Sequence, residues 1–144
     1  MRSNVAIGTM LVGVALLITG LPYVVQGNYH AEPEQKAKRT TLLKEALAGV
    51  QGKEAQVKHM EFPPGWVGSK HYHPGHVFVY VLEGTFIVDV EGTTRRTVGP
   101  GEVFHELPGS DRVMQARNGS AADWVKILVF QVGDEGTPIT VKVK

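Results

Sequence analysis

Hydrophobic and polar positions follow a period of two through most of the chain from residue 55 onward. Short runs of alternating or continuous apolar residues are bounded there by glycine and proline. This pattern predicts strands at residues 56–62, 77–82, 85–90, 93–98, 103–107, 113–116, 125–132 and 139–143. Several short strands joined by such turns indicate an all-β fold, an antiparallel sandwich or barrel.

The beginning of the chain has a different pattern. Arg2 precedes an almost continuous apolar run over residues 5–25, and Pro22 ends the helix that this run predicts. One positive charge before an apolar run is typical of a secretory signal, and the run is also long enough for an uncleaved membrane anchor. We therefore expect an exported protein, either periplasmic or extracellular, or anchored to the inner membrane.

Residues 28–54 link this segment to the predicted strands. Residues 28–39 are polar and contain a small basic cluster, which is either solvated or attracted to anionic lipid. Apolar residues within 42–50 have helical spacing, but the segment is short and an extended arm covering a barrel edge is the alternative. The expected organisation is a signal peptide or membrane anchor at 1–27, a linker and barrel-covering arm at 28–54, and a barrel at 55–144.

Composition narrows the classes of function. The 144 residues suffice for one domain, with 42% hydrophobic and 20% charged residues as in ordinary globular proteins. A net charge of +1 gives no reason to expect nucleic-acid binding. Because the chain has no cysteine, any bound metal must be held by His, Asp or Glu.

The most informative motif is His71-Tyr72-His73, followed by Pro74-Gly75. Residues two apart in a strand point to the same side of the sheet. His71 and His73 therefore present two imidazoles to one face, close enough to share a metal ion. A strand and its Glu83-Gly84 turn follow, and further Pro-Gly turns lie at 100–101 and 108–109.

On these motifs, residues 55–144 resemble a small single-domain cupin. The resemblance implies a double-stranded β-helix, the jelly-roll barrel, with a metal or a small molecule inside it and often a homodimer. It also implies that His71 and His73 are metal ligands. The expected cofactor is a divalent transition metal (Fe, Mn, Ni or Zn), and the expected partner is a small-molecule ligand or substrate.

The chain departs from the family pattern at two ligand positions. Val77 stands where the first motif commonly has a glutamate, and residues 110–114 contain no histidine where the second motif commonly has one. Glu106 or His105 are the replacements we consider first, and strand alternation allows only one of these neighbours to point inward. His76 and Asp111 are further candidates.

Three functions remain open from the sequence. The first is a metal-dependent enzyme acting on a small organic molecule, and the second is a metal-free, non-catalytic module that binds a small molecule. The third is a structural envelope module. Large apolar side chains are expected to fill the core rather than to contact a substrate: Tyr80, Phe86, Phe104, Met114, Trp124 and Phe130.

Overall fold

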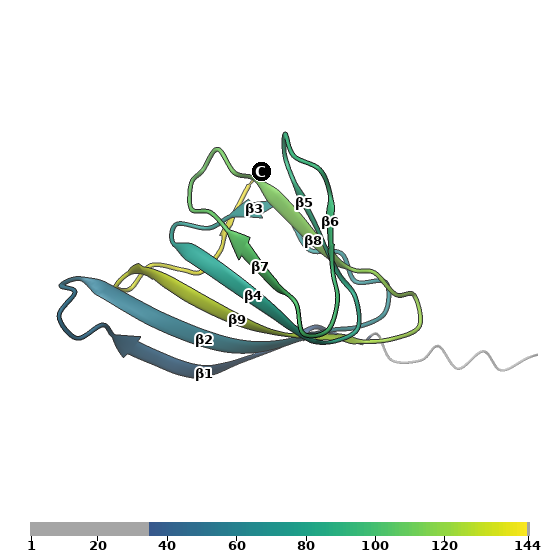
Figure 1. Ribbon diagram of the computed structural model, residues 1–144, viewed down its shortest axis with the longest axis horizontal. Coiled ribbons are helices and arrows are strands. Elements are labelled where there is room, and N and C mark those ends of the chain that lie inside the picture. Colours follow the sequence, from purple (N-terminus) through teal and green to yellow (C-terminus); the bar gives the residue numbers. More distant parts are fainter. Residues whose placement is uncertain (1–34, 144) are drawn as a thin grey trace, which may run out of the picture. The chain divides into compact units, whose positions relative to one another are not determined.

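The computed structural model describes residues 35–143, and this part of the chain consists of strands and turns without a helix. The strands are β1 (Lys38–Ala46), β2 (Lys53–Phe62), β3 (His71–Tyr72), β4 (His76–Glu83), β5 (Phe86–Val90), β6 (Arg96–Val98), β7 (Val103–Glu106), β8 (Met114–Asn118), β9 (Val125–Asp134) and β10 (Val141–Lys142). They form two five-stranded sheets, ordered β1-β2-β9-β4-β7 and β10-β3-β8-β5-β6 (Figure 1).

The predicted hydrophobic segment at 5–25 lies outside the described residues. Its expected role as a signal peptide or membrane anchor therefore stays a prediction. Within residues 35–143, no helix has the length and apolar character needed to cross a bilayer.

The segment for which helix and extended arm were both open is extended. Residues 38–46 form β1, which pairs antiparallel with β2 from Lys38 opposite Glu61 to Ala46 opposite Glu54. Every residue of β1 is exposed, so the strand is held mainly by its hydrogen bonds to β2. Helical spacing was misleading here because an edge strand offered the backbone a complete set of partners on one side.

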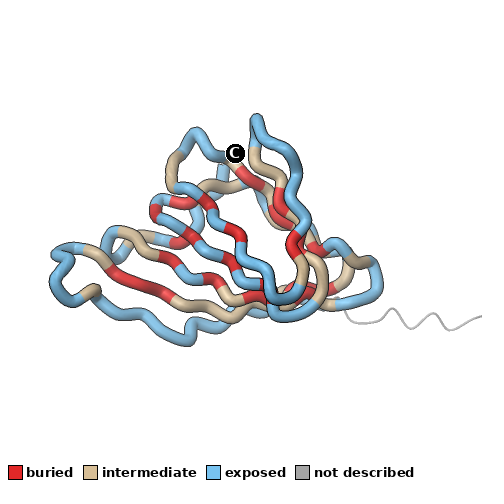
Figure 2. The backbone as a smooth tube through the Cα atoms, viewed as in Figure 1, coloured by how far each residue is buried: buried red, intermediate tan, exposed pale blue. Residues whose placement is uncertain are grey.

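The core lies between the two sheets. Alternate residues of β4 (Val77, Val79 and Val81) are buried, and β9 contributes Val125, Ile127 and Val129 from the adjacent strand. Figure 2 shows this alternation as buried and exposed residues taking turns along the strands. Fully burying one aliphatic side chain contributes about 1.5–3 kcal/mol, so this pattern decides which face of each strand turns inward.

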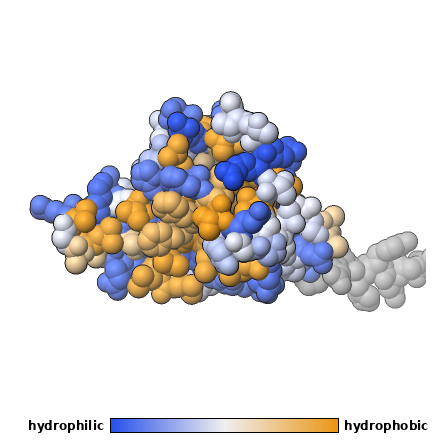
Figure 3. Space-filling view, in the orientation of Figure 1, coloured by the Kyte–Doolittle hydropathy of each residue, from blue (hydrophilic) through white to orange (hydrophobic). Residues whose placement is uncertain are grey.

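The outer face of the first sheet is unusually apolar. The expectation that Tyr80 and Phe130 belong to the core is wrong, because they are 41% and 39% exposed on the outward positions of β4 and β9. Phe86, Phe104 and Met114 are buried as expected. Hydrophobic residues gather over the face of the molecule seen in Figure 3.

Candidate functional site

The two motif histidines line one cavity. His71 lies on β3, which is held between β8 and β10 by pairing with Met114 and Lys142. His73 follows β3 directly and is buried, with 4% of its surface exposed. The two rings lie 4.9 Å apart and edge to face. Both side chains border the cavity, as their two-residue spacing predicts.

Backbone carbonyls orient both rings. Nδ1 of His71 donates to the carbonyl of Ser69 at 2.8 Å, and Nδ1 of His73 donates to the carbonyl of Ile139 at 2.6 Å. A carbonyl oxygen only accepts, so the proton of each neutral ring sits on Nδ1. Each Nε2 then presents a lone pair, which is the arrangement found in metal-binding histidines.

Glu106 reaches the same place from the other sheet. It is the last residue of β7, is buried, and its Oε2 lies 2.7 Å from Nε2 of His73. The contact does not meet the geometry of a hydrogen bond, so Nε2 of His73 is a buried polar atom without a hydrogen-bond partner among the described residues. The contact is an ion pair only when the ring of His73 is protonated.

The two imidazoles experience opposite electrostatic effects. Burial by itself would lower the pKa of His73, but the carboxylate of Glu106 and the carbonyl of Ile139 favour the charged ring, and its pKa is raised overall. For His71, burial is the largest effect and lowers the pKa, aided by the charge of His73 and opposed by the Ser69 carbonyl and by Glu106.

His105 lies on the opposite side of β7 from Glu106. Along this strand Phe104 and Glu106 are buried while Val103 and His105 are exposed. The ring of His105 stacks on Phe78 at 4.4 Å. The structure therefore brings Glu106, and not His105, to the two motif histidines.

The other candidate ligands are also outside the cavity. His76 lies on the exposed face, where its Nδ1 is 3.0 Å from Nε2 of His105. Asp111 is exposed in a turn and does not border the cavity, whereas Val77 does. The neighbouring Gly109 has a backbone role, since its N–H donates to the carbonyl of His73 at 3.0 Å.

The donors fit a transition metal in their chemistry but are not fully assembled. An unpartnered Nε2 of His73 facing a carboxylate, with Nδ1 already engaged, suits an imidazole–carboxylate metal site. Within residues 35–143, however, no three His, Asp or Glu side chains are close enough together to hold an ion as they stand. As they stand, His73 and Glu106 would offer two donors to a metal, and a third would require the ring of His71 to come closer.

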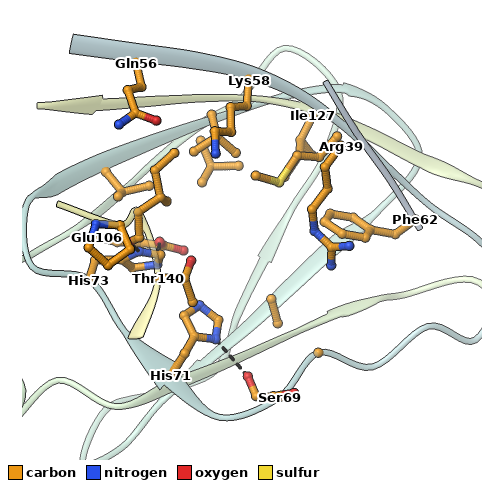
Figure 4. A pocket seen from close by; sticks show the side chains of 18 of the residues that line it. Arg39, Gln56, Lys58, Phe62, Ser69, His71, His73, Glu106, Ile127 and Thr140 are labelled. Carbon is orange, nitrogen blue, oxygen red and sulfur yellow. Dashed lines mark hydrogen bonds and ion pairs between the residues drawn. The ribbon is translucent and has the colours of Figure 1, made fainter. Parts of the chain in front are cut away.

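The cavity has a volume of about 770 Å³, within the range of small-molecule sites. About half of its wall is apolar, and the residues that contribute to this part include Met60, Phe62, Trp66, Val77, Val79, Phe86, Ala116, Ile127 and Val129. Figure 4 shows His71, His73 and Glu106 together on one side, and Arg39 and Lys58 directed into the cavity from β1 and β2. The arrangement offers a polar end, an apolar body and cations.

Sequence reasoning did not identify these two cations. Arg39 was assigned to the basic linker cluster, although it lies on β1 and its guanidinium sits 5.5 Å from the ring of Phe62. Lys58 lies between Gln56 and Met60 in the row of side chains on the inward side of β2. A lysine at an inward position of a correctly predicted strand is the signal that was available.

The part of the chain that matches a known protein family lies in the barrel. A family model described as "Cupin domain" matches residues 58–130, which is about half of the chain. A search of curated proteins finds no significant match.

Solved structures share the fold at low sequence identity. A cupin 2 domain-containing protein from Halorhodospira halophila is 19% identical with a TM-score of 0.60, covering 81% of this chain and 76% of that one. A cupin-like protein from Thermotoga maritima is also 19% identical with a TM-score of 0.60, covering 74% and 75%. The DMSP lyase DddQ from Ruegeria pomeroyi is 21% identical with a TM-score of 0.60, covering 74% of this chain, which spans about half (51%) of that lyase.

Proposed function

Because the chain belongs to the cupin domain family, we propose that it binds a small organic molecule in its barrel cavity beside a divalent transition metal. His73 and Glu106 are the first two metal donors in this proposal, and His71 is the third. One observation carries it: Nε2 of the buried His73 faces Glu106 at 2.7 Å without a hydrogen-bond partner among the described residues. A buried polar atom left in this way is costly unless something binds it.

The residues around the site have distinct tasks. The carbonyl of Ile139 holds the proton of His73 on Nδ1, which keeps the lone pair of Nε2 directed at the cavity. The carbonyl of Ser69 does the same for His71. When bound, a divalent metal supplies a Lewis acid that polarises an oxygen atom of the organic ligand.

The lyase activity of the Ruegeria pomeroyi neighbour is not part of the proposal. At 21% identity the likeness shows the fold alone. The type of reaction, if the protein catalyses one, must come from its own cavity residues.

Metal titration of untagged protein tests the proposal. Calorimetry with Zn²⁺, Fe²⁺, Ni²⁺ and Mn²⁺ at neutral pH should show saturable binding that is lost in His73→Ala and Glu106→Ala and weakened in His71→Ala. His105→Ala is the matched control, because the exposed His76–His105 pair is itself able to attract metal ions. Binding that disappears only in His105→Ala would refute the cavity site.

A metal-free cavity is the second candidate, and two observations favour it. The pKa of His73 is raised by Glu106, and no three-donor group is assembled among the described residues. In that case an imidazolium–carboxylate pair faces the ligand, with Nε2 of His73 as proton donor and Glu106 as acceptor. Folded protein that binds none of the four metals but still binds apolar probes in the cavity would favour this function.

We also propose that the barrel is exported. The support is the apolar run at 5–25 behind Arg2. A reporter fused after Leu47 should be active outside the cytoplasm, whereas activity confined to the cytoplasm would refute export.

A further inference from the structure

Cationic side chains outnumber carboxylates around the cavity, although the two kinds are almost balanced in the whole chain. The chain has 15 Lys and Arg against 14 Asp and Glu. Four cations border the cavity (Arg39, Lys44, Lys58 and Lys142), but Glu106 is its one carboxylate among the described residues. The overall composition therefore does not explain the charge of the cavity wall.

Part of this charge is already neutralised within the protein. Lys44 forms an ion pair with the buried Glu54 at 3.4 Å. The carboxylate of Glu106 lies beside His73 and forms no ion pair with the four cations. Within residues 35–143, neither Arg39 nor Lys58 forms an ion pair. These two cations lack an anionic partner in the part of the chain that the structure describes.

Lys58 occupies an inward position of β2. It shares one side of β2 with Gln56, Met60 and Phe62, and all of these residues line the cavity. The residue is half-buried, and among the described residues no carboxylate pairs with its ammonium group. Charged groups directed into a protein interior are usually paired, which makes an anionic ligand the natural partner.

Arg39 lines the same cavity as Lys58. Its guanidinium lies 5.5 Å from the centre of the Phe62 ring, in a cation–π contact. Phe62 in turn stacks on Trp66 with ring centroids 3.8 Å apart. Figure 4 shows Arg39 and Lys58 entering the cavity apart from His71, His73 and Glu106.

We propose that the ligand of this cavity is a small organic oxyanion with an apolar body. Its carboxylate or sulfonate group binds Arg39 and Lys58, and the body lies against Met60, Phe62 and Ile127. This inference rests on the proposed function, because it names the class of molecule that the cavity holds. Arginine and lysine supply charge-assisted hydrogen bonds to such an anion.

A pair of matched probes tests the charge requirement. 1-Anilinonaphthalene-8-sulfonate and N-phenyl-1-naphthylamine share one aromatic body, and only the first carries a sulfonate. Fluorescence titration of the full chain should show tighter binding of the sulfonate probe. Hexanoate should displace it and hexanamide should not.

Charge-removing variants locate the binding group. Arg39→Gln and Lys58→Gln should each weaken binding of the sulfonate probe by about tenfold, because each loses a charged hydrogen bond. Affinity for the neutral probe should be unchanged. Arg112→Gln is the matched control, since Arg112 is exposed and does not border the cavity.

A blocking variant separates this inference from the proposed function. Thr140 lines the cavity from an exposed position, so Thr140→Trp should fill its opening without disturbing the packed core, and both probes should be lost. Equal binding of the two probes, or an equal effect of Arg112→Gln, would overturn the oxyanion preference while leaving a ligand cavity. Binding of neither probe, or binding unaffected by Thr140→Trp, would overturn the ligand cavity and this inference with it.

Discussion

His73 and Glu106 join the two sheets across the interior of the barrel. Nε2 of His73, directly after β3, lies 2.7 Å from Oε2 of Glu106 at the end of β7, and both side chains are about 95% buried. When the ring of His73 is protonated the two groups form an ion pair, and at this depth there is little water to compensate for a missing partner.

Removing one member of this pair should destabilise the barrel. We expect Glu106→Ala to lower the free energy of unfolding by about 3 kcal/mol in urea, with a chelator present, because it leaves His73 buried without its carboxylate. Glu45→Ala, at an exposed position of β1, is the control and should have little effect. Equal losses in the two variants would mean that the pair does not stabilise the fold.

The two motif histidines should titrate on opposite sides of the ordinary histidine pKa of 6.5. NMR titration of chelator-treated protein should give a raised pKa for His73 and a lowered one for His71. In Glu106→Gln the pKa of His73 should fall below 6.5, because burial then acts with only the Ile139 carbonyl against it. A His73 pKa unaffected by Glu106→Gln would contradict this account.

These shifts also set the pH dependence of stability. The folded pKa of His73 is raised, so its contribution is fully present below about pH 6.5 and is lost as the pH rises through the folded value. The folded pKa of His71 is lowered, so its contribution is present above about pH 6.5 and is lost as the pH falls through the folded value. We expect the free energy of unfolding, measured with urea at a series of pH values around 6.5, to depend on pH differently in the two variants. Relative to the parent protein, the slope of this free energy against pH should change in opposite directions in His73→Gln and His71→Gln.

Asn118 should be a second sensitive position. Its buried amide nitrogen donates to the carbonyls of Phe62, Pro63 and Asp123, and its oxygen accepts from the N–H of Ser120 at 2.9 Å. Asn118→Ala removes all of these hydrogen bonds, and only the carbonyl of Pro63 is known to keep another donor, the N–H of Trp66. We expect a loss of about 3 kcal/mol in the free energy of unfolding.

Gln115 on the same strand provides the comparison for Asn118. It makes a single hydrogen bond, from its side chain to the carbonyl of Gly68 at 2.9 Å, and is only partly buried. Gln115→Ala should therefore cost about 1 kcal/mol. Similar urea midpoints for the two variants would show that the contacts of Asn118 act singly rather than as a group.

Gly75 places the turn that carries His73. A Cβ at this position would lie 2.5 Å from the carbonyl oxygen of Val132 and 2.8 Å from Cα of Gly133, so backbone must shift to accept any side chain. Gly75→Ala should lower the melting temperature by several degrees and weaken metal binding, because the turn moves away from β9. Gly99→Ala, whose Cβ would meet only a side-chain atom of Glu102 at 3.4 Å, should leave both unchanged.

What the sequence alone determined is local. The period of two located seven of the eight predicted strands within a few residues, and the eighth, at 139–143, is reduced to the two-residue β10. Sequence spacing also placed His71 and His73 on one side, because successive side chains of an extended backbone point to opposite faces. Both predictions need only the geometry of one strand.

Only the tertiary structure decided which residues meet. Alternation allowed either His105 or Glu106 to face inward, and the pairing of β7 with β4 placed Glu106 inside. The partner of Nδ1 in His73 is a carbonyl 66 residues away in the sequence. Which atoms meet across that distance depends on the register of strands in two sheets. Alternation within one strand fixes which side chains share a face, but not which residues of a distant strand lie opposite them.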